Sequence, residues 1–128
     1  MNPVVGAART DRSGRRVRFA HDSERRFANI LDFYGVAWEY EPVEFVLERG
    51  DDGRVTVAFR PDFWLPAPGI FVELTTLDQR LVTKKNRKIR QMAAIFPDVR
   101  VTILYQRDTL ALLAKFGLAT GASFSRSA

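Results

Sequence analysis

The chain has 128 residues, which suits one domain that buries about two thirds of the surface its unfolded form exposes. Its 46% hydrophobic and 27% charged residues are typical of a globular protein, no apolar run approaches the ~20 residues of a membrane span, and the absence of cysteine excludes disulfides and thiolate metal sites. The formal net charge of +5 favours a polyanionic partner such as nucleic acid. We expect a cytoplasmic protein that does not contact membranes.

Residues 1–18 form a basic segment that we predict to be disordered. Five arginines in it face a single acid, Asp11, and the segment shows no hydrophobic periodicity. The three arginines next to the predicted fold are candidate phosphate contacts: Arg15, Arg16 and Arg18. A solubilising tail without a ligand is the alternative interpretation. The folded domain is expected over 19–117, and a Ser- and Gly-rich flexible tail over 118–128.

A first helix is predicted from Ser23, a favourable N-cap residue, to Tyr34, with Gly35 ending it. Its apolar residues have the i, i+3, i+4, i+7 spacing of a helix that packs on a core: Phe27, Ile30, Leu31 and Tyr34. Glu24 lies at the N-terminal end of the same stripe, so its carboxylate is predicted to face inward. The alternative is a first-turn acid that complements the helix dipole.

A β-hairpin is predicted in the middle of the chain. Residues 38–48 are rich in aromatic and β-branched side chains, and the Asp-Asp-Gly sequence at 51–53 is a turn signal. Residues 55–59 are the expected partner strand. Pro61 then ends the ladder and leads into a predicted apolar loop at 63–66.

Two buried strands and two helices complete the predicted fold. Continuous apolar runs at 70–75 and 99–105 indicate strands that are covered on both faces. A helix is expected between them at 84–96, and a last helix at 109–116 is closed by Gly117. The order α-β-β-β-α-β-α implies an α/β fold with a mixed central sheet flanked by helices.

Two carboxylates in this arrangement need an explanation. Asp62 follows the hairpin, and Glu73 lies inside a strand whose neighbours are apolar. A buried carboxylate is costly to desolvate, and two of them on neighbouring strands are most simply explained by a shared divalent metal. The alternatives are a turn-capping role for Asp62 and an ion pair between Glu73 and the following helix.

The order of elements resembles that of the PD-(D/E)xK nuclease superfamily, and the resemblance is carried by Glu24, the Pro-Asp pair ending at Asp62, and Glu73. It covers about residues 19–113 and implies the restriction-endonuclease-like αβββαβα fold. It also implies that Asp62, Glu73 and the carbonyl of Leu74 hold a Mg²⁺ or Mn²⁺ ion, with Glu24 facing the same site. The implied activity is endonucleolytic hydrolysis of phosphodiester bonds in DNA, with the metal activating a water molecule.

The motif lysine of the superfamily is missing from its usual place. It would stand two residues after Glu73, where this chain has Thr75. Some members recruit the lysine from the next helix instead. Lys85 is the first candidate because the residues four and seven positions after it belong to the inward stripe of that helix. The resemblance therefore implies that Lys85 orients the water, with Lys88 as the second choice.

Further polar residues of this helix are candidate contacts to the nucleic acid: Lys84, Arg87 and Gln91. The alternative is a solvated helix face, which most charge runs on helices form. Duplex, branched or mismatched DNA and RNA are all compatible substrates. Members of the superfamily that cut both strands are often dimers, so a homodimer is one expected assembly.

The missing lysine at Thr75 supports a second interpretation, a catalytically degenerate nuclease fold that binds nucleic acid or a protein partner. A third interpretation is an accessory domain of a nucleotide-metabolism enzyme. The chain lacks a phosphoribosyl-binding loop, so it cannot be a phosphoribosyltransferase itself. His21 is the single histidine, and without a second histidine or a cysteine it cannot build a zinc site.

Overall fold

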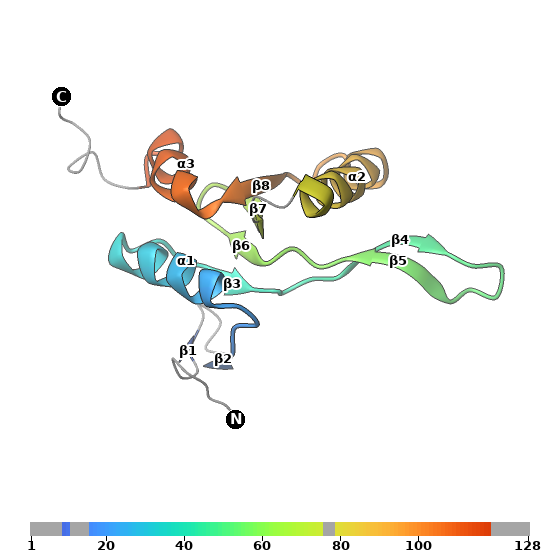
Figure 1. Cartoon of the computed structure of the whole chain (residues 1–128), viewed down its shortest axis with the longest axis horizontal. Helices are drawn as coiled ribbons and strands as arrows, with labels where there is room; N and C mark the ends of the chain where they lie inside the picture. The colour runs from blue at the N-terminus through green and yellow to red at the C-terminus, as the bar shows by residue number, and fades with distance from the viewer. Residues whose placement is uncertain (1–8, 11–15, 76–78, 119–128) are drawn as a thin grey trace.

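The computed structural model describes residues 9–10, 16–75 and 79–118. The elements in chain order are β1 (Arg9–Thr10), β2 (Arg16–Val17), α1 (Asp22–Phe33), β3 (Glu39–Tyr40), β4 (Phe45–Arg49), β5 (Val55–Phe59), β6 (Phe63–Leu65), β7 (Ile70–Thr75), α2 (Gln79–Ile95), β8 (Val101–Tyr105), a 3-10 turn (Gln106–Asp108) and α3 (Thr109–Lys115) (Figure 1). None of the helices in these described ranges has the length and apolar character needed to cross a membrane.

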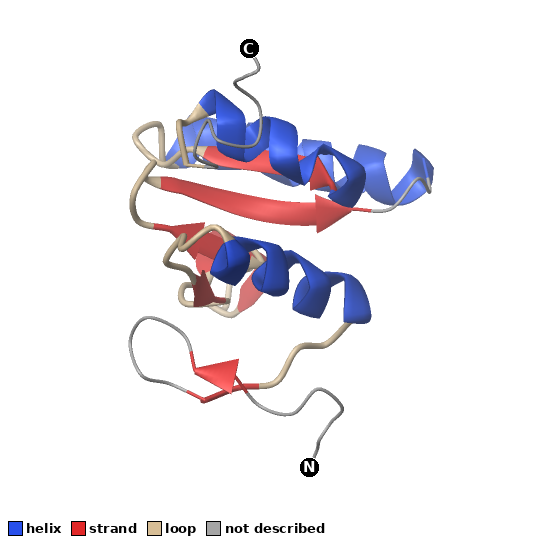
Figure 2. Ribbon diagram, turned by 90° about the vertical axis from the view of Figure 1, so that its left-hand side faces the viewer, coloured by secondary structure: helices blue, strands red, loops and turns tan. Residues whose placement is uncertain are grey.

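The central sheet is mixed, as predicted. Its four strands lie in the order β3-β6-β7-β8; β6 pairs antiparallel with β3 and β7, and β7 pairs parallel with β8. Helices α1 and α3 lie on one side of this sheet, while α2 lies on the other together with the β4–β5 hairpin, which extends away from the body of the molecule (Figures 1 and 2). The chain is therefore a mixed α/β protein with helices on both faces of its sheet.

The side chains of β7 divide between two cores because successive residues of a strand point to opposite faces. Val72 and Leu74 belong to the larger core, with residues of α1 and α3 such as Leu31 and Leu113. Phe71 faces the other way, and its ring centroid lies 5.4 Å from that of Phe45 in the hairpin. Glu73 has the parity of Phe71, so its carboxylate emerges on the α2 side of the sheet.

The predicted strands at 55–59 and 70–75 are confirmed, since β5 and β7 have those bounds. The predicted loop at 63–66 was wrong, because residues 63–65 form β6 in the interior of the sheet. Phe63 and Leu65 have no exposed surface. This segment pairs on both sides, so its backbone groups are satisfied despite the flanking prolines.

Other boundaries differ from the predictions by a few residues. Helix α1 begins at Asp22 with His21 as its N-cap, not Ser23, and α2 begins at Gln79 instead of residue 84. The predicted strand at 38–48 is divided into β3 and β4.

At the N-terminus, β1 and β2 form a short antiparallel pair and Val17 is 2% exposed in the larger core. The larger core therefore includes Val17, a residue of the segment predicted to be a tail. The rest of the predicted N-terminal tail, and the predicted C-terminal tail from residue 119 onward, lie outside the described residues.

Candidate functional site

An open pocket of about 390 Å³ lies at the end of β7 and brings together the residues singled out in the sequence. Four acids line it, Glu24, Glu41, Asp62 and Glu73, together with one lysine, Lys85. With all four acids ionised, four carboxylates against one ammonium give the pocket a formal charge of −3, although the whole chain carries +5. Such a concentration of carboxylates attracts cations and repels a bare phosphate.

Asp62 and Glu73 are joined by reciprocal backbone hydrogen bonds. The backbone N–H of Asp62 donates to Glu73 Oε1 at 3.1 Å, and that of Leu74 donates to Asp62 Oδ2 at 2.9 Å. Both acids are buried, with 8% and 9% of their surface exposed. Each carboxylate is thus oriented by the strand segment that carries the other, and the predicted convergence of the two acids is observed.

Glu24 reaches the same pocket from α1 and is 4% exposed. Its Oε1 accepts hydrogen bonds from the Tyr40 hydroxyl at 2.6 Å and from the backbone N–H groups of Ala20 at 3.1 Å and His21 at 3.3 Å. Within the described part of the chain, no donor contacts Glu24 Oε2 or Asp62 Oδ1. Each of these carboxylates therefore retains one oxygen for a ligand.

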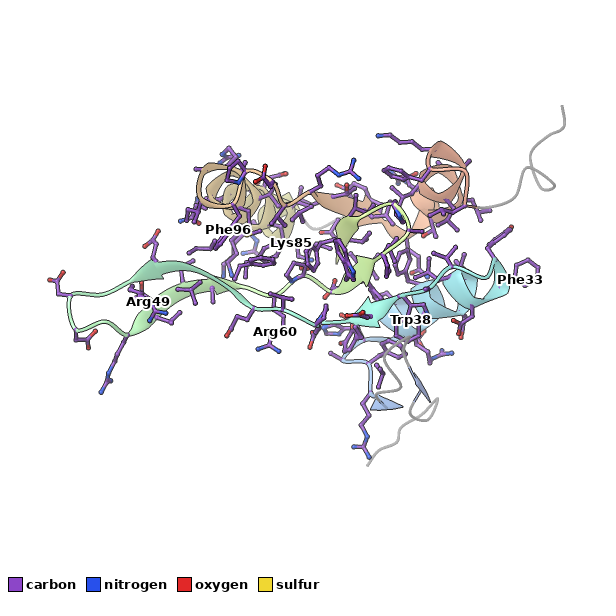
Figure 3. All side chains as sticks on the ribbon, turned by 180° about the vertical axis from the view of Figure 1, so that it is seen from behind. Phe33, Trp38, Arg49, Arg60, Lys85 and Phe96 are labelled. Carbon is purple, nitrogen blue, oxygen red and sulfur yellow. The ribbon has the colours of Figure 1, made fainter. Side chains whose placement is uncertain are left out.

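Lys85 extends from α2 toward the central sheet (Figure 3). Its Nζ lies 3.3 Å from Glu73 Oε2 and also donates to the carbonyl of Leu74. The lysine expected from the helix therefore reaches the strand that carries the acid. Lys88, the second choice, instead donates to the Ala58 carbonyl in β5 at 2.9 Å and is not among the residues that line the pocket.

Those predicted nucleic-acid contacts whose side chains the structure describes lie outside the pocket lining. Arg18, Lys84 and Arg87 are exposed. Gln91 donates to Glu48 Oε2 at 2.7 Å and so connects α2 to the hairpin. Arg15 and the side chain of Arg16 lie outside what the structure describes.

Glu41 lines the pocket but was not predicted from the sequence. It has φ of 44°, the left-handed region that is costly for a residue with a side chain. Its N–H donates to the Asp62 carbonyl at 2.8 Å, which places it directly beside that acid. The one sequence signal is Pro42, because a proline restricts the residue before it and breaks the strand pattern. Strained residues of this kind concentrate at functional sites.

Burial governs the proton affinities in the pocket. The pKa of Asp62 is raised to about 8: burial is the largest cause, the charges of Glu73 and Glu24 add to it, and the Leu74 hydrogen bond and Lys85 act against it. Burial also raises the pKa of Glu73, against the effect of the Lys85 ammonium. The pKa of Tyr40 is raised by burial and by its hydrogen bond to Glu24, so its hydroxyl stays protonated and continues to donate.

The residues present fit Mg²⁺ or Mn²⁺ on one condition. Among the described residues, no cluster of three or more His, Cys, Asp or Glu side chains forms a ready-made metal cage. Mg²⁺, however, needs only a few carboxylate oxygens and retains several waters. Asp62 can offer one oxygen, but Glu73 Oε2 and the Leu74 carbonyl already contact Lys85. Glu73 Oε2 and the Leu74 carbonyl become available to a metal ion when the Lys85 ammonium moves away from them.

Comparison with models of protein families, with curated proteins and with solved structures found no match to this chain. The relationship to the nuclease superfamily is therefore a prediction from the residues and their arrangement.

Replacing Asp62 should change how stability depends on pH. The folded protein holds the Asp62 proton up to a pKa of about 8, while the ordinary value of 3.8 applies after unfolding. The contribution of the Asp62 carboxyl to the free energy of unfolding is therefore complete below pH 3.8 and is lost as the pH rises through 8. In metal-free buffer, Asp62→Asn should gain stability relative to wild type over that interval, by on the order of a few kcal/mol.

Urea unfolding at a series of pH values measures this difference. Asp51→Asn, which removes an exposed carboxyl from the hairpin turn, controls for the loss of one charge. A stability difference between wild type and Asp62→Asn that stays constant with pH would contradict the assignment.

Relieving the backbone strain at Glu41 should raise the stability of the protein and at the same time weaken its metal binding. Glycine adopts a φ of 44° without steric cost, so Glu41→Gly should raise the free energy of unfolding by about 1 kcal/mol. The same substitution removes a carboxylate from the pocket and should weaken Mn²⁺ binding. Glu44→Gly, at a nearby position without positive φ, should be destabilising. Equal effects of the two substitutions in thermal unfolding would show that Glu41 is not strained.

Proposed function

We propose that the chain is a Mg²⁺- or Mn²⁺-dependent endonuclease of the PD-(D/E)xK type that hydrolyses phosphodiester bonds in DNA. The observation that carries this proposal is the meeting of four charged residues in one pocket. They come from α1, the β5–β6 connection, β7 and α2: Glu24, Asp62, Glu73 and Lys85. Acids that can hold a divalent metal, beside an amine that can meet a phosphate, suit metal-assisted phosphodiester hydrolysis.

The fold is consistent with this assignment. A restriction-endonuclease-like domain requires a mixed sheet between helices, with both acids at one end of adjacent strands. Here β6 and β7 are antiparallel neighbours, so the segment just before β6 lies beside the far end of β7. That pairing explains why Asp62 and Glu73, separated by ten intervening residues, meet.

Each pocket residue has a role in the proposal. Asp62, Glu73 and the Leu74 carbonyl would hold the divalent cation, and Glu24 would face it from the same pocket. When bound, the cation polarises the phosphoryl group and lowers the pKa of a coordinated water. Lys85 would help to position the attacking water against the phosphate, and Tyr40 keeps Glu24 in place through their hydrogen bond.

The approach of DNA depends on charge. The pocket carries an excess of carboxylates, so a phosphate enters favourably only after a cation has reduced that charge. Exposed basic side chains on and near the domain, among them Arg18, Lys84 and Arg87, supply contacts to the phosphate backbone that do not depend on base sequence.

One observation favours a second candidate function, a degenerate nuclease fold that binds nucleic acid or a protein partner without cutting. Lys85 contacts Glu73 Oε2 and the Leu74 carbonyl, the two groups expected to bind the metal. Thr75 occupies the usual place of the motif lysine. In this case the ammonium replaces the metal permanently, and DNA binding would be sensitive to salt but unaccompanied by cleavage.

Nicking of supercoiled plasmid and of branched DNA tests the main proposal. Wild type should nick with Mg²⁺ or Mn²⁺ and be inactive in EDTA, and Asp62→Asn should lower the rate by at least about 100-fold because a metal ligand is lost. Glu44→Gln removes a carboxylate that lies outside the pocket, paired with Arg60 at 3.7 Å, and should leave the rate unchanged.

Cleavage that survives Asp62→Asn would rule out the nuclease assignment for this pocket. DNA binding without cleavage in either metal, together with a melting temperature that the metals do not shift, would establish the degenerate module instead.

A further inference from the structure

We propose that Lys85 is an internal counter-cation that competes with the divalent metal for the pocket, so that metal binding and release of the lysine are one event. The inference rests on the proposed function, because it concerns the same site. It adds a means of regulation: the pocket holds either the Lys85 ammonium on Glu73 and Leu74 or a metal ion there, but not both.

The contacts of Lys85 are the first argument. Its Nζ is 3.3 Å from Glu73 Oε2 and also donates to the Leu74 carbonyl, so one ammonium contacts two of the three groups that would bind the metal. Mg²⁺ lies about 2.1 Å from each ligand oxygen. An ion bound to these two oxygens and the ammonium that already contacts them would be close neighbours of the same sign, and they would repel strongly.

The charge of the pocket is the second argument. Lys85 is the one lysine or arginine beside four acids in the lining, and its side chain is only 25% exposed. It therefore supplies the compensating charge that Glu73 needs in the absence of metal. A divalent ion supplies twice that charge, so Glu73 no longer needs the Lys85 ammonium to compensate its own charge.

The length of the lysine side chain is the third argument. Lys85 lies on α2, across from β7, and reaches the strand through a flexible four-carbon stem. Displacement therefore requires only side-chain rotation and leaves the helix in place. The stem keeps a displaced ammonium near the pocket but off Glu73 and Leu74, where an incoming phosphate would meet it. Metal loading thus moves Lys85 from a structural contact to a position from which it can act on the substrate.

Mn²⁺ affinity in the absence of nucleic acid tests the competition without relying on activity. Isothermal titration calorimetry compares wild type with Lys85→Met, which keeps an apolar stem and removes the charge. The matched control is Lys88→Met, three residues further along α2, where the ammonium contacts the Ala58 carbonyl instead of the pocket acids. We expect Lys85→Met to bind Mn²⁺ at least about tenfold more tightly than wild type, and Lys88→Met to bind as wild type does.

The outcomes separate the inference from the proposed function. Equal or weaker Mn²⁺ binding by Lys85→Met, with measurable binding by wild type, would overturn the competition and leave the nuclease proposal intact. Binding by Lys85→Met alone would support the competition and favour the degenerate module for the natural chain. Absence of binding in both proteins would overturn the inference and the metal-dependent function together. If Lys85→Met does not fold, Lys85→Gln, which keeps a donor for the Leu74 carbonyl, serves as the neutral variant with the same expectation.

Discussion

The reciprocal hydrogen bonds between Asp62 and the segment Glu73–Leu74 are the interaction on which the rest of the structure depends. Burying two carboxylates costs free energy unless hydrogen bonds and an opposite charge compensate. Here each acid accepts a backbone N–H from the strand segment of the other, and Lys85 adds its ammonium. The same bonds hold the chain at the start of β6 against β7. The site and the register of the central sheet therefore stabilise each other.

The alternation of side chains along β7 explains how one short strand serves both core and site. Val72 and Leu74 complete the core beneath α1 and α3, and the intervening Glu73 faces α2, where Lys85 meets it. A shift of one residue in the pairing of β7 would bury the carboxylate among aliphatic side chains and expose two core residues. The register is therefore strongly determined, which makes the position of Glu73 in the pocket precise.

Much of this arrangement could be predicted from the sequence, because its signals are local. Turn residues predicted β5 and a continuous apolar run predicted β7, both with their observed bounds, and helical spacing identified Lys85 as the lysine that faces inward. The features that were missed depend on tertiary contacts. Residues 63–65 are only three long and lie between prolines, so their role as a central strand follows from partners on both sides. The positive φ of Glu41 is likewise maintained by its contact with the Asp62 carbonyl, which no local pattern encodes.

The central claim is that Asp62 and Glu73 form a divalent-metal site, and that the Lys85 ammonium competes with the metal for it. Crystals soaked in Mn²⁺ and measured at the manganese absorption edge test it most directly. We predict an anomalous peak within ligand distance of Asp62 and Glu73, with the Lys85 ammonium moved away from the Leu74 carbonyl. A pocket without such a peak, in which Lys85 still contacts Glu73 and Leu74, would contradict the account.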